Sequence, residues 1–223
     1  MKILPNCITP SRNELDIRNR ENVFNFFKKH NINNVIHTAA LTSIRKCEEE
    51  KESAWETNVI GTQNLVDALN FTNSKANFVY ISTACVFKGD KQMYTEKSIP
   101  NPVNFYALTK LIGEKIVESL SNHIIIRTNF VARKKWPYEK AFTDRYGTYL
   151  FAEDVSIGIK EIFESKQKEL IHLVGDEIFS MYDLAKITTP EIKPMTLQDY
   201  SGPHLTVNMT LDSLYWKKYK ISN

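Results

Sequence analysis

Apolar runs of strand length alternate with amphipathic helices through the first 130 residues, and this order most constrains the fold. Three runs are expected to form buried strands, at residues 34–40, 77–82 and 123–128. The two segments between them, residues 48–70 and 106–120, place apolar side chains at helical spacing. Strands that alternate with helices in this way form a parallel sheet. The sequence therefore predicts an α/β fold built on a Rossmann-like, doubly wound parallel sheet.

The pattern weakens after residue 130. We expect one further strand at residues 169–175 and short helices at residues 181–187 and 211–219, with prolines marking irregular chain between them. A short strand or an extended arm is expected at residues 2–4. The sequence thus predicts a core at residues 1–130 and a small, loop-rich lobe at residues 131–223, packed on the core as part of the same structural unit.

Small and polar residues follow three of the predicted strands. These segments are Ala39-Ala40-Leu41, Thr83-Ala84-Cys85 and Asn129-Phe130. In an open parallel sheet, ligands bind in the crevice beyond the carboxyl ends of the strands. We therefore expect the three segments to contribute to a single site.

Tyr106 and Lys110 are candidates for acid–base chemistry at that site. Residues four apart share one face of a helix, and a nearby ammonium favours the phenolate and lowers the pKa of a phenol. Thr83, at a strand end, can hold a carbonyl oxygen beside that phenol, so the three residues could exchange a proton with an alcohol oxygen. The alternative is that Tyr106 and Lys110 only mark a half-exposed helix face.

Composition excludes several classes of function. The net charge of +3 is too small to indicate nucleic-acid binding, and the short basic runs are typical of solvated faces. No apolar run has the length of a membrane span, and no signal-peptide core is present near the start. Three cysteines without paired spacing indicate a reducing, cytoplasmic compartment. No metal site is expected.

An ordered series of motifs resembles the extended short-chain dehydrogenase/reductase family, and within it the dTDP-4-dehydrorhamnose reductases and their sugar-nucleotide relatives. The series runs from about residue 12 to residue 187. It comprises Leu15-Asp16-Ile17, residues 35–40, residues 57–62, Ile81-Ser82-Thr83, residues 86–89, Tyr94-Thr95-Glu96, Asn101-Pro102, Tyr106 to Lys110, and residues 127–130. An ordered series at plausible spacing is far more specific than one motif.

The resemblance implies a role for each matched position. Tyr106 would exchange the proton at a sugar carbonyl, Lys110 would assist it and bind the nicotinamide ribose, and Thr83 would hold the carbonyl oxygen. NAD or NADP would lie along residues of the 1–130 core, which is then a dinucleotide-binding core. Besides Tyr106 and Lys110, the implied cofactor-binding residues are Asp16, Ile17, Ala39, Ala40, Leu41 and Asn129. The implied substrate is a keto-deoxy sugar on a nucleoside diphosphate, with the cofactor carrying the hydride step.

The start of the chain departs from that family. The family binds the pyrophosphate with a glycine-rich turn and a helix N-terminus, whereas no glycine occurs here before Gly61. Either the chain is truncated at its start, or its dinucleotide affinity is weak or lost. The fold would then be an N-terminally abridged Rossmann sheet with an exposed edge, which a partner chain or a second copy in a homodimer could cover.

Three further residues have two interpretations each. Cys85 resembles the cysteine of GDP-fucose synthase that exchanges a proton beside the keto carbon, but we favour a small buried thiol, which is the usual place of a free cysteine. Trp136, with Phe130, Thr83 and Cys85, is a candidate substrate contact, although Trp136 and Tyr138 could simply pack between lobes. His37 lies on an apolar strand and is expected to be a core histidine.

Two functions remain open from the sequence. One is an NAD(P)-dependent reductase or epimerase of nucleotide sugars. The other is a non-catalytic, sugar-nucleotide-binding or regulatory homologue that has lost cofactor binding.

Overall fold

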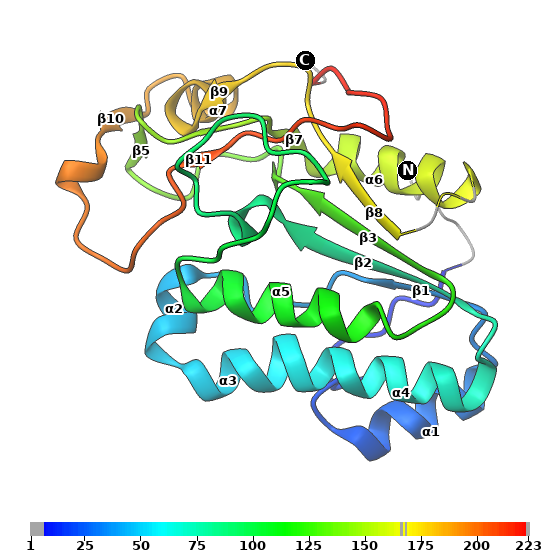
Figure 1. The fold of residues 1–223 in the computed structure, drawn as a ribbon. Coiled ribbons are helices and arrows are strands. Elements are labelled where there is room, and N and C mark those ends of the chain that lie inside the picture. Colours follow the sequence, from blue (N-terminus) through cyan, green and yellow to red (C-terminus); the bar gives the residue numbers. More distant parts are fainter. Residues whose placement is uncertain (1–6, 166, 168, 222–223) are drawn as a thin grey trace.

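A four-stranded parallel sheet forms the centre of the molecule (Figure 1). The computed structural model describes residues 7–165, 167 and 169–221, so the strand expected at residues 2–4 lies outside the described residues. The sheet has the order β1-β2-β3-β8. Its strands are β1 (Asn34–His37), β2 (Asn77–Thr83), β3 (His123–Thr128) and β8 (Glu169–Leu173). The predicted α/β fold with a parallel sheet is confirmed.

Helices cover both faces of this sheet. On one side lie α5 (Phe105–Val117) and α4 (Gly61–Asn73), with α1 (Arg20–His30) packed on α4, and on the other side lies α6 (Ala152–Ser165) (Figure 1). Successive side chains of a strand point to opposite faces. Phe78 and Tyr80 of β2 accordingly pack in the cluster with α1, α4 and α5, whereas Val79 and Ile81 pack in the cluster with α6. The continuous apolar run of β2 follows from this two-sided burial.

The helix that begins this layer, α1, starts where its sequence signals indicate. Asn19 is the N-cap, and its side chain accepts a hydrogen bond from the N–H of Asn22 at 3.0 Å. Lys28, Lys29 and His30 lie in the last turn, where the helix dipole favours positive charge.

The helical region expected at residues 48–70 is longer and interrupted. It comprises α2 (Ile44–Glu49), α3 (Lys51–Trp55), a π-helical turn at Glu56–Ile60, and α4. The π turn carries Asn58, whose side chain accepts from Leu41 N at 2.8 Å and donates to Leu41 O at 3.0 Å and to Thr109 Oγ1 at 2.9 Å. Asn58 thus fixes the loop after β1 against α5, and π turns are frequent at functional sites.

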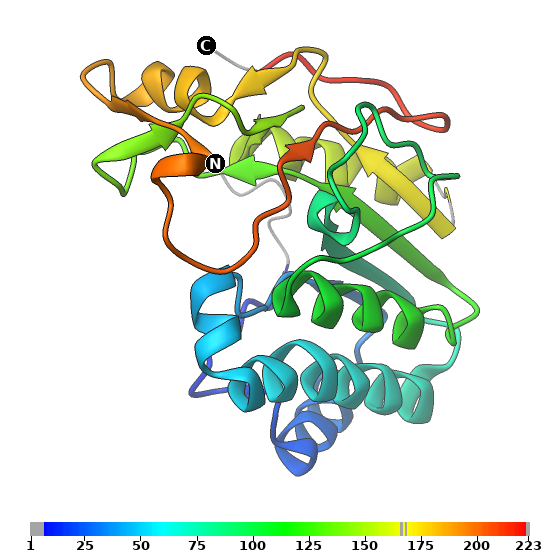
Figure 2. The ribbon, with the colours of Figure 1, turned by 60° about the vertical axis from the view of Figure 1, so that its left-hand side comes forward.

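Short strands and one helix gather beyond the carboxyl ends of β2 and β3 (Figures 1 and 2). They form three small sheets, with orders β10-β5, β11-β6-β9 and β4-β7. The helix is α7 (Met181–Thr188), as predicted. The strands are β4 (Phe130–Val131), β5 (Lys140–Phe142), β6 (Tyr146–Gly147), β7 (Leu150–Phe151), β9 (Phe179–Ser180), β10 (Lys193–Met195) and β11 (Asn208–Met209). Because β8 and α6 also come from the second half of the chain, that half completes the central layers as well.

The helix expected at residues 211–219 is wrong. Tyr219 forms a parallel bridge with Gly175, and the Glu96 carboxylate accepts from Ser213 Oγ and Leu214 N at 2.7 Å and 3.0 Å. These polar groups therefore bind partners distant in sequence instead of forming a helical ladder. No helix in the described part of the chain is long and apolar enough to cross a membrane.

Candidate active site

Thr83 ends β2 at the carboxyl edge of the sheet. It lies beside Thr128, its register partner on β3, because the two parallel strands end together. A 3-10 turn, Ala84–Val86, follows at once, and Thr83 Oγ1 accepts a hydrogen bond from Cys85 N at 3.1 Å. The hydroxyl is thereby held at the strand end, as the sequence predicts.

Tyr106 reaches the same edge from the first turn of α5. Asn104 caps this helix by accepting from Ala107 N at 2.9 Å, and Glu48 Oε1 accepts from Phe105 N at 2.7 Å. These two contacts fix where α5 begins and bring the Tyr106 phenol close enough to the Thr83 side chain for that side chain to lower the phenol pKa. The structure therefore brings Thr83 and Tyr106 together.

The electrostatics of Tyr106 differ from the expectation. Burial raises the pKa of Tyr106, the Cys85 thiol adds to this, and the hydrogen bond from Thr83 acts in the opposite direction. The expectation that Lys110 lowers the pKa of Tyr106 is wrong for this geometry, because the Lys110 ammonium lies over the Tyr80 ring, 4.0 Å from its centroid. Tyr106 consequently holds its proton at neutral pH.

Lys110 is itself strongly affected by its surroundings. It is 4% exposed. Burial lowers the pKa of Lys110 to about 7, and the Glu114 carboxylate acts to raise it. Its ammonium is thus near the midpoint of titration at neutral pH. A buried lysine whose pKa is shifted in this way is a candidate for a functional role.

A buried ion pair between Glu114 and Arg127 lies close to Lys110. Glu114 accepts from Arg127 Nε at 2.9 Å and from Arg127 Nη2 at 2.6 Å, and it also accepts from Ser82 Oγ at 2.5 Å. Both charged residues are almost fully buried. Sequence reasoning missed Glu114 and Arg127. The signal was present, since residues 106, 110 and 114 continue one stripe of the helix at a spacing of four.

The C-terminal segment covers Cys85. Met209 Sδ lies 3.6 Å from Cys85 Sγ, and the Met209 carbonyl accepts from Asn129 Nδ2 at 2.6 Å. Thr206 Oγ1 donates to the carbonyl of Cys85 at 3.5 Å. We call residues 204–211 the covering segment. Cys85, Thr83 and Tyr106 are all buried, and Met209 of this segment belongs to the same buried cluster as Cys85 and Tyr106.

The predicted cofactor residues after β1 form a more open loop. Ala39 is exposed, Ala40 and Leu41 are half-buried, and the backbone of Leu41 is held by Asn58. The charge of Lys110 helps to lower the pKa of His37, the last residue of β1, which indicates that Lys110 lies close to this end of the strand. The loop and Lys110 therefore share one side of the site.

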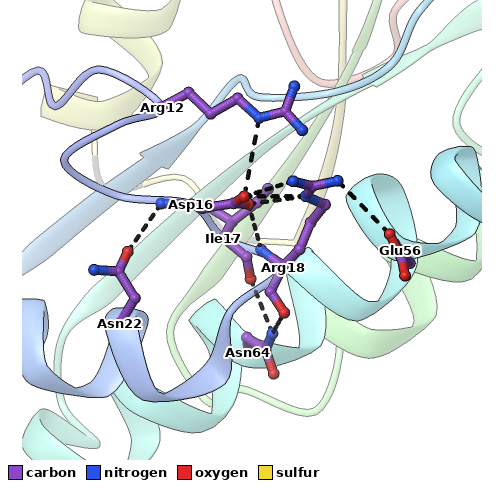
Figure 3. Close-up of polar contacts among 7 residues, drawn as sticks. All are labelled: Arg12, Asp16, Ile17, Arg18, Asn22, Glu56 and Asn64. Carbon is purple, nitrogen blue, oxygen red and sulfur yellow. Dashed lines mark hydrogen bonds and ion pairs between the residues drawn. The ribbon is translucent and has the colours of Figure 1, made fainter.

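Asp16 and Ile17 lie in a turn before α1 (Figure 3). The Arg18 guanidinium binds the Asp16 carboxylate through Nε at 3.0 Å and Nη2 at 2.6 Å, and this contact lowers the pKa of Asp16 to about 2. Arg12 lies 4.0 Å from the same carboxylate. The carbonyl of Ile17 accepts from Asn64 Nδ2 at 2.9 Å. Arg18 was not identified in the sequence analysis. Only its position two residues after Asp16 could have indicated this contact.

The remaining predicted positions lie apart from this cluster or fill the core. Trp136 packs with Ala141, Ala185 and Ile192 in a separate apolar cluster, and Phe130 on β4 is 47% exposed. His37 is a core histidine, as expected, since its Nε2 lies 3.0 Å from Thr62 Oγ1 and burial lowers the pKa of His37 to about 3. A surface cleft of about 510 Å³ beside α1 is lined by none of the predicted site residues.

The family model for the RmlD substrate binding domain matches residues 5–202. The chain belongs to this family. A dTDP-4-dehydrorhamnose reductase of Aggregatibacter actinomycetemcomitans is 32% identical over 194 residues, which cover 77% of this chain and 65% of that enzyme. The chain thus spans about two thirds of that relative. Methionine adenosyltransferase 2 subunit beta of Xenopus tropicalis is 40% identical over 91 residues, 41% of this chain and 26% of that protein.

Solved structures of this RmlD family have the same fold. A dTDP-4-dehydrorhamnose reductase of Clostridium acetobutylicum superposes with a TM-score of 0.83 at 29% identity, over 92% of this chain and 80% of the other. The Bacillus anthracis reductase, solved in complex with NADP, superposes with a TM-score of 0.86 at 22% identity, over 95% and 84%. The second likeness concerns the fold alone.

The described residues of this RmlD-family chain fit the nicotinamide end of a dinucleotide better than its middle. At that end lie the loop after β1, with its small side chains, and the Lys110 ammonium, which contacts an aromatic ring. Between residues 7 and 60 the chain has no glycine, so the described part before Gly61 has no glycine-rich cradle for a pyrophosphate. We assign residues only to the nicotinamide end.

Proposed function

We propose that this RmlD-family protein is an NAD(P)-dependent reductase or epimerase of a keto-deoxy sugar attached to a nucleoside diphosphate. One observation carries the proposal: Thr83 and Tyr106 lie close together at the carboxyl edge of a parallel sheet, with Lys110 one helical turn away. Ligands bind at this edge in open α/β sheets. The likeness to enzymes named dTDP-4-dehydrorhamnose reductase supports the same substrate class.

The proton step follows from the state of Tyr106. The bound nicotinamide would supply the hydride to the keto carbon. Tyr106, whose raised pKa keeps it protonated, gives its proton to the oxygen of that carbonyl as it becomes an alcohol. Thr83 donates a hydrogen bond to the same oxygen. Lys110 and the loop at Ala39–Leu41 hold the nicotinamide ribose.

Tyr106→Phe tests this assignment. The variant removes the proton donor and keeps the ring, so NADPH oxidation in the presence of a keto-sugar nucleotide should fall by about 10²–10⁴-fold. The melting temperature should stay close to that of the wild type, because the change removes a single hydroxyl. Thr83 keeps its hydrogen bond with Cys85 N in the variant. Tyr215→Phe, at an exposed position, is the control. Unchanged turnover in Tyr106→Phe would refute the assignment.

A regulatory role is the second candidate, and two observations favour it. The covering segment packs on Cys85 and Asn129, and Tyr106 is buried beside them. In addition, three relatives that match part of the chain are named methionine adenosyltransferase 2 subunit beta. In this case the chain would bind a nucleotide or a partner without turnover. Calorimetric titration with NADPH and the turnover assay together separate the two roles. A chain that oxidises NADPH with any keto-sugar nucleotide is catalytic, and this result would exclude the purely regulatory role.

A further inference from the structure

Arg145 is a buried arginine without an acidic partner. It precedes β6 and is 7% exposed. Its Nε donates to the Thr206 carbonyl at 2.8 Å, whereas Nη1 and Nη2 contact only the thioether sulfurs of Met181 and Met209, each at 3.3 Å. Thioether sulfur is a weak acceptor. The guanidinium charge is therefore not neutralised by the groups around it.

The other deeply buried arginine provides an internal comparison. Arg127 forms two short hydrogen bonds with Glu114 and is neutralised. Among the ion pairs of the described residues, by contrast, none includes Arg145. A buried charge without a counter-charge costs several kcal/mol of desolvation. Packing alone would be served better by an apolar side chain of similar length, so the charge itself calls for another explanation.

A second buried polar group lies in the same place. Tyr149 is 3% exposed, and its hydroxyl has no hydrogen-bond partner among the described residues. Arg145 and Cys85 both act on this hydroxyl electrostatically, so it lies near both, and Tyr149 belongs to the same buried cluster as Cys85. Buried hydroxyls normally have a partner, and an unpaired one needs an explanation.

Arg145 and Tyr149 border the candidate active site. Met209 Sδ contacts Arg145 Nη2 on one side and Cys85 Sγ on the other. Cys85 in turn acts on Tyr106, and Tyr106, Cys85, Tyr149 and Met209 belong to one buried cluster. The guanidinium is thus separated from Cys85 by one methionine side chain of the covering segment, and Cys85 shares a buried cluster with Tyr106.

We propose that Arg145, with the Tyr149 hydroxyl, is the binding site for the diphosphate of the nucleotide sugar, and that Met209 and its covering segment occupy this site until the substrate displaces them. The proposal rests on the proposed function, because it uses the substrate class named there. It adds the residues that recognise the anionic group.

The chemistry of the two groups fits a diphosphate. The planar guanidinium can bind two phosphate oxygens at once, and a phenol hydroxyl can donate to a third. In a nucleotide sugar, the diphosphate is attached directly to the sugar ring, so its site must lie near Tyr106. Met209, which contacts Arg145, belongs to the same buried cluster as Tyr106. Methionine side chains are flexible and weakly held by polar contacts, so Met181 and Met209 can move from the guanidinium at low cost.

Binding of nucleoside diphosphates tests the proposal without any turnover. The full chain is titrated calorimetrically with dTDP, UDP and GDP, with thymidine as an uncharged probe. Arg145→Met removes the charge but keeps an unbranched side chain between two methionines, so the protein should fold with a melting temperature close to or above that of the wild type. The affinity for the best nucleoside diphosphate should fall by about 10- to 100-fold.

Two further variants separate recognition from structure. Tyr149→Phe removes only the unpaired hydroxyl and should weaken the same nucleoside diphosphate by a smaller factor while leaving stability unchanged. Arg20→Met removes one positive charge on α1, away from the site, and should bind as the wild type does. Arg145→Met should not change the affinity for thymidine, because that probe carries no phosphate.

The outcomes distinguish this proposal from the proposed function. If Arg145→Met binds all three nucleoside diphosphates as tightly as the wild type, or if the wild type binds none of them, the diphosphate site is refuted even where turnover is found. If the affinity depends on Arg145 but no keto-sugar nucleotide supports NADPH oxidation, the site stands and the reductase assignment fails.

Discussion

At the scale of single residues, burial decides the protonation states of the site. Tyr106 keeps its proton because burial raises its pKa, and Lys110 loses part of its charge because burial lowers its pKa to about 7. Mutual attraction alone would lower the pKa of the phenol and raise the pKa of the lysine. Burial shifts both pKa values in the opposite directions. Proximity in sequence predicts that Tyr106 and Lys110 share a helix face, but the burial of each depends on the strands and on the covering segment.

Lys110 should make the stability of the folded chain depend on pH. Its folded pKa of about 7 lies below the unfolded value of 10.5, so the unfolded chain binds more protons between these two values. The free energy of unfolding should therefore rise with pH across this window, by at most about 1.4 kcal/mol per pH unit. Urea titrations of wild type and Lys110→Met across this range measure the slope.

The variant should be more stable than the wild type near neutral pH and should lack this part of the slope. Lys75→Met, at an exposed position, is the matched control and should retain it. Above the window the buried phenols Tyr106 and Tyr149 act in the other direction, because their raised pKa values keep them protonated in the folded chain only. Equal slopes for wild type and Lys110→Met would contradict the burial of an uncharged lysine.

At the scale of secondary-structure elements, α5 holds the site because it packs closely on β2. Gly113 permits this approach, since a Cβ atom there would lie 2.1 Å from Tyr80 Oη and 2.7 Å from Tyr80 Cζ. Tyr80 also carries the ring beneath Lys110 and donates from its hydroxyl to the Lys110 carbonyl at 3.3 Å. The spacing between α5 and β2 therefore also fixes the position of Lys110.

Gly113→Ala should destabilise the chain although alanine is the better helix former. The intrinsic preference favours alanine by about 1 kcal/mol, but displacing the Tyr80 ring should cost about 1–3 kcal/mol more than this gain. The urea midpoint should fall. Gly61→Ala is the control in a helix of the same layer, because its nearest neighbours are terminal atoms of the flexible Ile17 side chain. A Gly113→Ala variant as stable as Gly61→Ala would mean that α5 does not depend on this contact.

Elements with local signals were predictable, and elements that depend on distant partners were not. The strands at β2 and β3 and the helix α5 follow from apolar runs and helical spacing within their own residues. Residues 211–219 have similar spacing, yet their polar groups bind Glu96 and Gly175, which no local pattern indicates. In the site, Thr83 and Tyr106 were predictable in the same way as these strands and this helix, because both belong to recognisable motifs.

Arg145 shows the limit most clearly. Its partners Thr206 and Met209 are 61 and 64 residues away in the sequence, and the lack of an acidic neighbour is visible only once the chain is folded. The resemblance to the family also did not predict that the Lys110 ammonium lies over the Tyr80 ring. Sequence motifs thus predicted which strand ends meet, but not which groups remain unpaired there.

At the scale of the whole molecule, the last part of the chain closes a site that the first part builds. The carboxyl ends of β2 and β3 supply Thr83 and Asn129, and the covering segment with β11 crosses them from the small sheets (Figure 2). Movement of this one segment would uncover both Cys85 and Arg145, which its Met209 contacts. Such a movement can be followed through the thiol of Cys85, which this segment buries.

Asn129→Ala should expose Cys85 more often. The variant removes the hydrogen bond from Asn129 Nδ2 to the Met209 carbonyl, a contribution of about 1 kcal/mol to holding the segment in place. Modification of Cys85 by a thiol reagent under native conditions should therefore be roughly fivefold faster. The exposed Cys7 is replaced by serine in every sample, and mass spectrometry of peptides separates Cys85 from the buried Cys47. Lys91→Ala, on an exposed loop, is the control. If Asn129→Ala leaves the Cys85 rate unchanged while its global stability is unaltered, the segment does not open independently and substrate must reach Tyr106 by another route.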